Sequence, residues 1–176
     1  KDMGILLALL ATVIVYFLVS ISFARLITRI VAPDADISKI EQPVPNSDAI
    51  FVSDAVSATS VRIHVGTRYG CLTALLDMLK VAIQTLALKM WQPKTRYFLI
   101  VAAAGVVGHN WPLFHRFKGG RGASPIIGGL LVIDWVGALV TNLVGGLLGL
   151  ALGNLLVLRR AGRLLMIPWF WLRTRD

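Results

Sequence analysis

The residues best suited to chemistry lie in one polar segment, GHNWPLFHRFKGGRGAS, which spans residues 108 to 124. It contains three glycines and two cations close together: Gly119, Gly120, Gly122, Lys118 and Arg121. The glycines free the backbone to adopt positive φ and to direct successive N–H groups at one point, and the cations add donors. This composition favours a phosphate cradle. It lacks the G-x-x-x-x-G-K-[ST] spacing of a nucleotide-binding loop, and a basic turn that touches only lipid head groups is the alternative.

Three further polar residues border or interrupt apolar runs. His109 lies where an apolar run meets the polar segment, and no carboxylate is near it in the sequence to orient it as a general base. Both a structural and a catalytic role therefore stay open for this histidine. Asp77 and Lys80 are three residues apart and share one helical face. A charge inside a membrane span is costly unless it is paired or faces a cavity, so these two form either a structural ion pair or part of an active site.

The elements that must position these residues are membrane helices. Of 176 residues, 56% are hydrophobic and only 15% charged, and the mean hydropathy is +0.74, whereas a soluble domain is about one quarter charged. The 18 Lys and Arg exceed the 9 Asp and Glu, which is typical of the cytoplasmic loops of a membrane protein and does not favour a nucleic-acid partner. The single cysteine, Cys71, cannot form an internal disulfide, and no ligand cluster predicts a metal site.

The pattern of apolar runs predicts an all-α, polytopic protein with about five membrane crossings, since roughly 20 apolar residues cross the hydrocarbon. We expect one membrane domain over residues 1–176, divided as follows: a first span at 3–24, a cytoplasmic loop at 25–70, spans at 71–90 and 97–107, the glycine-rich basic loop at 108–124, two spans within 125–158 and a basic interfacial tail at 159–176. The two spans are expected to divide near Asp134, and Pro168 to interrupt the apolar part of the tail.

A row of glycines marks the second of these two spans. Gly145, Gly149 and Gly153 follow one another at four-residue intervals, which predicts a smooth groove for the close approach of another helix. Together with the tryptophan-rich tail, this groove could dock a neighbouring transmembrane subunit. The alternative is that glycine is simply common in membrane helices.

The polar segment also carries a family resemblance. GHNWPLFHRFKGGRG resembles the signature GH-x-x-P-x-F-x-x-FKGGKG of the acyl-phosphate-dependent glycerol-3-phosphate acyltransferases of bacteria, the PlsY family, with Arg121 where that family usually has lysine. Upstream, SATSVRIHVGTRYGCLTALLDMLK is similar to the family's GATN segment with its D-x-x-K pair, and VSISFARL resembles GSIPFGYL. These three motifs occur in the family's order, from about Ser20 to Gly128.

The resemblance implies a PlsY-like helical bundle of the bacterial plasma (inner) membrane, in contact with membrane lipid. Its activity would be acyl transfer from acyl phosphate to glycerol 3-phosphate, giving lysophosphatidic acid, with no cofactor and no acyl-enzyme intermediate. The implied catalytic residues are Ser20, His109 and Lys118. The implied substrate-binding residues are Thr59, Ser60, Arg62, Gly119, Gly120, Arg121 and Gly122.

Departures from the family pattern keep a second function open. Ser57 and Ser60 replace the glycine and asparagine of GATN, Ile63 stands where an arginine is expected, residues 33–51 are inserted, and the final helices with their H-R-E-N motif have no counterpart. The first hypothesis is a divergent acyltransferase, or part of one. The second is a catalytically degenerate relative that serves as a structural transmembrane subunit of a larger complex. A channel or transporter has little support because no inverted repeat is apparent.

Overall fold

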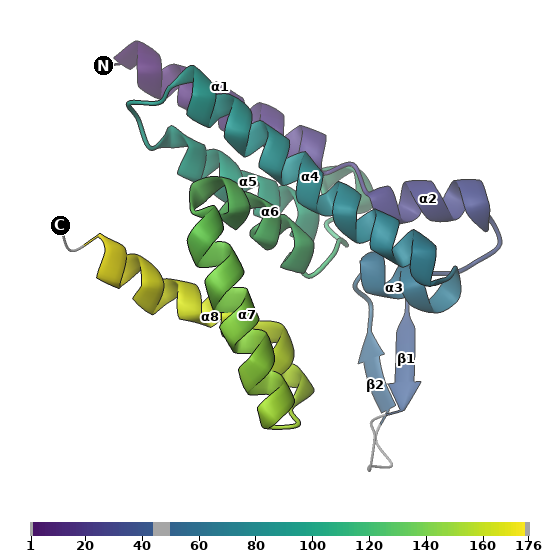
Figure 1. Ribbon diagram of the computed structural model, residues 1–176. Coiled ribbons are helices and arrows are strands. Elements are labelled where there is room, and N and C mark those ends of the chain that lie inside the picture. The colour runs from purple at the N-terminus through teal and green to yellow at the C-terminus, as the bar shows by residue number, and fades with distance from the viewer. Residues whose placement is uncertain (1, 44–49, 175–176) are drawn as a thin grey trace. The chain divides into compact units, whose positions relative to one another are not determined.

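The structure is a computed structural model that describes residues 2–43 and 50–174, most of them in helices (Figure 1). Two compact units make up the chain, Lys1–Gly129 and Leu130–Asp176. The elements in chain order are α1 (Asp2–Val19), α2 (Phe23–Val31), β1 (Ile40–Pro43), β2 (Ile50–Ser53), α3 (Ala58–His64), α4 (Thr67–Trp91), α5 (Tyr97–Asn110), a 3-10 turn η1 (Leu113–His115), α6 (Ala123–Ile133), α7 (Trp135–Ala151) and α8 (Leu155–Arg173).

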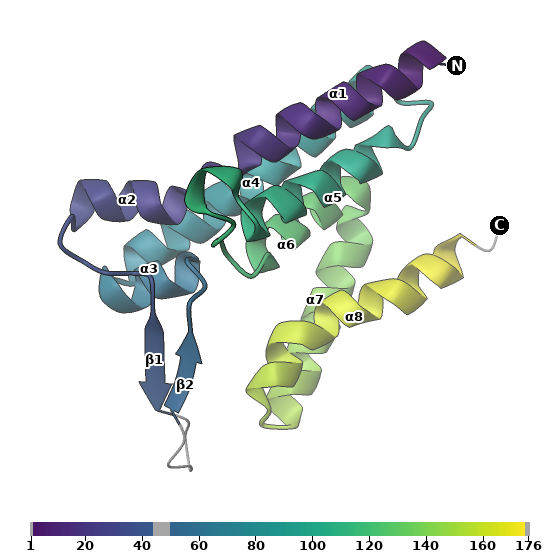
Figure 2. The same cartoon turned by 180° about the vertical axis from the view of Figure 1, so that it is seen from behind.

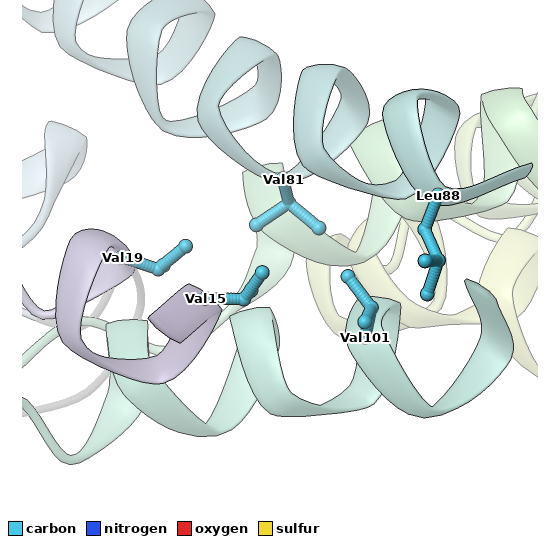
Figure 3. Close-up of a cluster of buried hydrophobic side chains, with 5 residues drawn as sticks. All are labelled: Val15, Val19, Val81, Leu88 and Val101. Carbon is cyan, nitrogen blue, oxygen red and sulfur yellow. The ribbon is translucent and has the colours of Figure 1, made fainter. Parts of the chain in front are cut away.

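The centre of the first unit is a three-helix layer of α1, α4 and α5, which lie side by side in both views (Figures 1 and 2). Small apolar side chains let these helices approach closely and fill the space between them. Figure 3 shows them pointing toward one another: Val15, Val19, Val81, Leu88 and Val101. This packing holds together α4, which carries Asp77 and Lys80, and α5, which carries His109.

The outer surfaces of these helices are apolar as well. On α1, for example, Leu6, Leu9 and Ile14 each expose more than half of their surface, at 54%, 56% and 57%. A continuous apolar exterior of this kind is costly in water and is matched by lipid. By length and composition three stretches can cross a membrane: Gly4–Val31, Thr67–Trp91 and Tyr97–His115. Two shorter apolar helices, α6 and α7, follow them, and the count of about five crossings stays a prediction.

The first apolar run contains a break that the sequence did not predict. The expected span at 3–24 ends earlier, because α1 stops at Val19 and α2 begins at Phe23. Ser22 is the N-cap of α2, and its Oγ accepts a hydrogen bond from the Arg25 N–H at 3.4 Å. Serine competes with the helical backbone for hydrogen bonds, so a serine pair favours such a break. Ser20 therefore lies in a bend between two helices.

The predicted cytoplasmic loop at 25–70 holds more structure than expected. It contains α2, a two-stranded antiparallel hairpin in which Ile40 lies opposite Ser53, and α3. Four buried side chains form a second apolar core beneath these elements: Ala24, Ile37, Val56 and Val61. The described part of the inserted residues 33–51 thus supplies β1 and the start of β2, and the two strands project from α3 in both views (Figures 1 and 2).

In the second unit, α7 and α8 form a helical hairpin, and the last helix boundary differs from the expected one. The helix that follows Asp134 ends at Ala151, not near residue 158, because Gly153 adopts φ +60° and Asn154 caps the next helix by accepting a hydrogen bond from the Leu156 N–H at 2.9 Å. Helix α8 then returns along α7. Its backbone at Leu158 and Gly162 occupies the space that a Cβ at Gly149 or Gly145 would need.

This pairing corrects the interpretation of the glycine row. Gly145 and Gly149 form a smooth face, but α8 of the same chain covers it, and Gly153 lies in the connecting turn instead of on that face. The groove expected to dock a neighbouring subunit is therefore an internal packing surface.

The tail at 159–176 is also more regular than expected, since α8 continues through Pro168 to Arg173. A proline removes one helical hydrogen bond, and tertiary contacts must compensate for this loss. Those contacts lie just beyond the proline: the Trp169 Nε1–H donates to Asp134 Oδ2 at 2.9 Å, and Arg173 Nη1 donates to both Asp134 oxygens at 2.8 Å. Asp134 in turn caps α7 by accepting the Gly137 N–H at 3.0 Å. One carboxylate thus joins both ends of this hairpin.

Candidate active site

The first site residue predicted from the sequence, Ser20, is fully buried in the bend between α1 and α2. Its Oγ donates to the Tyr16 carbonyl at 2.7 Å and accepts the Leu113 N–H at 3.4 Å. The second contact reaches η1, directly after α5. Ser20 therefore ties the bend in the first helix to the start of the glycine-rich loop.

The glycine-rich loop folds back over the end of α5. The Phe117 N–H donates to the Pro112 carbonyl at 3.0 Å, and the Gly120 N–H donates to the His109 carbonyl at 3.1 Å. Two non-glycine residues, Arg116 at φ +53° and Phe117 at φ +60°, adopt left-handed conformations that make this reversal possible. The loop is therefore a defined turn held by main-chain hydrogen bonds.

The glycines of this loop were expected to adopt positive φ and to direct their N–H groups at one point, and most of them do not. Only Gly122 of the three has a positive φ, at +72°, and the Gly120 N–H is already bonded to His109 instead of directed at a ligand. What Gly119 and Gly120 provide is close approach. A Cβ at Gly119 would overlap the His109 carbonyl, and one at Gly120 would overlap Nε2 of the His109 ring. The absence of side chains thus lets the loop lie directly on His109.

Two other segments meet the loop from outside. The Val56 N–H donates to the Gly119 carbonyl at 3.0 Å, and Arg25 Nη2 donates to the Lys118 carbonyl at 3.1 Å. The segment before α3, the start of α2 and the glycine-rich loop therefore lie together at one end of the three-helix layer. That residues 25–70 and 108–124 lie on one side of the membrane stays a prediction.

The substrate-binding residues predicted near GATN lie on α3. Ser60 is buried, and its Oγ donates to the Ser57 carbonyl at 2.7 Å and accepts the Ser57 N–H at 2.8 Å, which closes a capping box. Thr59 is half-buried and Arg62 is exposed. Ser60 thus shapes the start of α3, while the roles of Thr59 and Arg62 in binding stay predictions.

A buried charged cluster of Asp77, Lys80 and His109 lies directly behind the loop. His109 is one of the predicted catalytic residues, and Asp77 and Lys80 were expected to form either a structural ion pair or part of an active site. Asp77 is 2% exposed; its Oδ1 lies 2.8 Å from Lys80 Nζ and 3.5 Å from His109 Nδ1. Lys80 Nζ also donates to the Ile21 carbonyl at 3.1 Å and lies 5.4 Å from the centre of the Phe23 ring. The carboxylate that the sequence did not place near His109 therefore comes from α4. The D-x-x-K spacing signalled the ion pair with Lys80 but not the contact with His109.

The chemistry of the assembled site is that of anion binding. Lys118 and Arg121 lie exposed on the loop, and Arg25 is hydrogen-bonded beneath it. Cations at a defined backbone turn suit phosphate groups. Across the described ranges, 2–43 and 50–174, no three His, Cys, Asp or Glu residues are grouped as a metal would require.

Comparison with known proteins identifies the family. The family model described as glycerol-3-phosphate acyltransferase matches residues 9–173. The chain belongs to this glycerol-3-phosphate acyltransferase family. The match includes the first helix, the glycine-rich loop and the α7–α8 hairpin, so the PlsY resemblance is confirmed along nearly the whole chain.

Individual members of the glycerol-3-phosphate acyltransferase family support this assignment. The enzyme of Aquifex aeolicus is 30% identical over 138 residues, which are 78% of this chain and 65% of that protein. Glycerol-3-phosphate acyltransferase 1 of Oceanobacillus iheyensis is 31% identical over 91 residues, which are 47% of this chain and 44% of that protein. The chain thus spans less than two thirds of either curated relative.

A solved family structure confirms the fold class. The crystal structure of PlsY, an integral membrane glycerol 3-phosphate acyltransferase in its glycerol 3-phosphate form, aligns with a TM-score of 0.76 and 26% identity, and the alignment covers 95% of this chain and 78% of PlsY. Together with the three stretches long and apolar enough to span, this likeness shows an all-α, multi-pass membrane protein.

Proposed function

We propose that this chain is a glycerol-3-phosphate acyltransferase that uses acyl phosphate and produces lysophosphatidic acid at the cytoplasmic face of a bacterial plasma membrane. The observation that carries the proposal is the loop at 117–122. It presents Lys118 and Arg121 while hydrogen bonds tie it to α2, to the segment before α3 and to His109. Family membership and the likeness to PlsY support the same substrates.

In the proposed reaction, a hydroxyl oxygen of glycerol 3-phosphate attacks the acyl carbonyl carbon. A new ester bond forms, the bond between the carbonyl carbon and the phosphate oxygen breaks, and inorganic phosphate leaves. The hydroxyl proton passes to a phosphate oxygen of the substrate. The protein contributes positioning and charge stabilisation: Lys118 and Arg121 hold the anionic groups, and the Gly119–Gly120 turn fixes their height above His109.

Ser20 and His109 are proposed to act in this reaction from beneath the loop. Their present contacts are with protein groups, namely the Leu113 N–H for Ser20 and the Gly120 N–H for the His109 carbonyl. Ser20 therefore holds the loop near its start, at Leu113, and His109 holds it near its end, at Gly120. Contact of either side chain with the substrate is part of the proposal. The alternative role as a docking subunit loses its main support, because α8 covers Gly145 and Gly149.

Replacing Lys118 with alanine tests the role of the loop. A charge-assisted contact to phosphate contributes about 1.5–3 kcal/mol, so kcat/KM for glycerol 3-phosphate should fall by at least about tenfold. The control is Lys94→Ala, an exposed lysine in the turn between α4 and α5, which should leave kcat/KM unchanged. An active protein indifferent to Lys118→Ala would remove the loop from the mechanism. A folded, unmodified protein that transfers no acyl group would contradict the proposed function itself.

Membrane sidedness gives an independent test. In a Cys71→Ser background, single cysteines introduced by Ser38→Cys and Ala123→Cys should react with an impermeant maleimide only after cells are permeabilised, because both segments are proposed to be cytoplasmic. A Lys94→Cys variant should react in intact cells, since Lys94 precedes the N-terminus of α5, whereas the glycine-rich loop follows its C-terminus. Labelling of Ser38→Cys and Ala123→Cys from opposite sides would contradict this topology.

A further inference from the structure

The charged cluster behind the loop consists of Asp77, Lys80 and His109. Besides neutralising each other, Asp77 and Lys80 make contacts with other parts of the chain. The side chains of Asp77 and Lys80 are 3% and 7% exposed, and the other buried residues of α4 are uncharged. Burying an ion pair costs several kcal/mol per ion in desolvation, and pairing often no more than offsets that cost. An apolar pair would fill the same space. What the charges add is polar contacts with two segments: Lys80 donates to the Ile21 carbonyl, and Asp77 lies beside the His109 ring.

Lys80 makes the first of these contacts. Its Nζ lies 2.8 Å from Asp77 Oδ1 and donates to the Ile21 carbonyl at 3.1 Å. Ile21 directly follows Ser20 in the bend between α1 and α2. The carboxylate holds the ammonium group, and the ammonium group holds the bend.

His109 makes the second contact. Its Nδ1 lies 3.5 Å from Asp77 Oδ1, and the opposite edge of the ring, at Nε2, lies against Gly120. The side chain is 8% exposed, so the ring has little room to turn. The Gly120 N–H is bonded to the His109 carbonyl at 3.1 Å. The orientation of the ring therefore sets how closely the loop can approach α5.

From these contacts we infer that Asp77 is a positioning residue for glycerol 3-phosphate binding: through Lys80 it fixes the Ser20 bend, and through His109 it fixes the Gly119–Gly120 turn. This inference rests on the proposed function for its substrate. It assigns to the buried carboxylate a role apart from neutralising Lys80. That role is to fix the Ser20 bend and the Gly119–Gly120 turn in position relative to each other.

The deciding experiment compares two variants that both lack the lysine, Lys80→Met and Asp77→Asn/Lys80→Met. If Asp77 served only to neutralise Lys80, its removal once the lysine is gone would change neither the KM for glycerol 3-phosphate nor the exchange of the loop. If it positions His109, the double variant should show a KM for glycerol 3-phosphate about tenfold above that of Lys80→Met, because small displacements at a site cost large factors. The KM for acyl phosphate should differ less, and the unfolding midpoint should not fall, since no unpaired buried charge is left.

A second readout needs no substrate. Amide hydrogen exchange of the peptide that contains residues 117–122 should be about tenfold faster in the double variant than in Lys80→Met, because the Gly120 N–H loses its fixed support. If the unmodified protein transfers no acyl group, the proposed function fails while this measurement still tests the positioning role. Asp134→Asn is the control, because that carboxylate contacts Trp169 and Arg173 and should leave KM and loop exchange unchanged.

Two outcomes would overturn the inference. Equal KM and equal loop exchange in the two variants would limit Asp77 to neutralising Lys80. A double variant that fails to fold while Lys80→Met folds would assign the carboxylate to folding alone. If Lys80→Met itself does not fold, amide exchange of residues 117–122 is compared between Asp77→Asn and the unmodified protein. Equal exchange in these two proteins would overturn the inference.

Discussion

Replacing Gly120 with alanine should lower kcat/KM for glycerol 3-phosphate by about 100-fold or more, because a shift of roughly 1 Å at a binding loop can cost that factor. The added Cβ would overlap Nε2 of His109. That ring cannot easily yield, since it is buried and its other edge faces Asp77. The loop must therefore lift away from α5, and Lys118 and Arg121 move with it. Steady-state kinetics with acyl phosphate at saturation would measure the loss.

The matched control for this change is Gly146→Ala in α7, where an added Cβ meets no atom within 4 Å. Alanine in a helix is favoured over glycine by about 1 kcal/mol, so this variant should be as stable or slightly more stable, with unchanged activity. The unfolding midpoint of Gly120→Ala should stay close to that of the unmodified protein. Full activity in Gly120→Ala would show that the loop does not depend on its contact with His109.

Gly149→Leu should destabilise the α7–α8 hairpin by about 3 kcal/mol, near the upper end of what overpacking typically costs. The Cβ alone would overlap the backbone at Leu158, and the rest of the leucine side chain would hold the two helices apart. Helices in lipid associate through close packing of small residues, so separating the two backbones weakens the packing that joins α7 to α8. Equilibrium unfolding in mixed detergent micelles, followed by tryptophan fluorescence, would report on Trp169 at its hydrogen bond with Asp134.

Gly146→Leu is the control, because its side chain points into open space. It should unfold at the same detergent ratio as the unmodified protein. The comparison also separates an internal role of the glycine row from an intermolecular one. A Gly149→Leu protein that is fully stable as a monomer but loses a partner on purification would contradict the packing of α8 on α7 and restore the docking interpretation.

The glycine-rich loop shows what local sequence can predict. Its position after an apolar helix, its cations and its family signature all follow from residues close together in the chain. How the glycines act did not follow, since a glycine that permits positive φ and one that permits close approach look the same in a sequence. Gly122 is of the first kind, and Gly119 and Gly120 are of the second.

The Asp77–His109 contact shows where sequence reasoning ends. The D-x-x-K spacing predicts the ion pair within one helix, which the structure confirms at 2.8 Å. The contact of Asp77 with His109 depends on how α4 and α5 pack, and no periodicity within either helix specifies that rotation. Helix ends were hard to predict for a related reason: Pro168 reads as a break unless one knows that Asp134 binds the residues beyond it.

The role of Asp134 in the helical hairpin also bears on biosynthesis. Its carboxylate leaves the ribosome 39 residues before Arg173, its ion-pair partner, which corresponds to about 2–8 s at ordinary bacterial elongation rates. For the first 35 residues of that interval Trp169 is also not yet synthesised, and the carboxylate has the local Gly137 N–H to bond. The corner before α7 therefore gains its cationic partner only when the end of α8 has been translated.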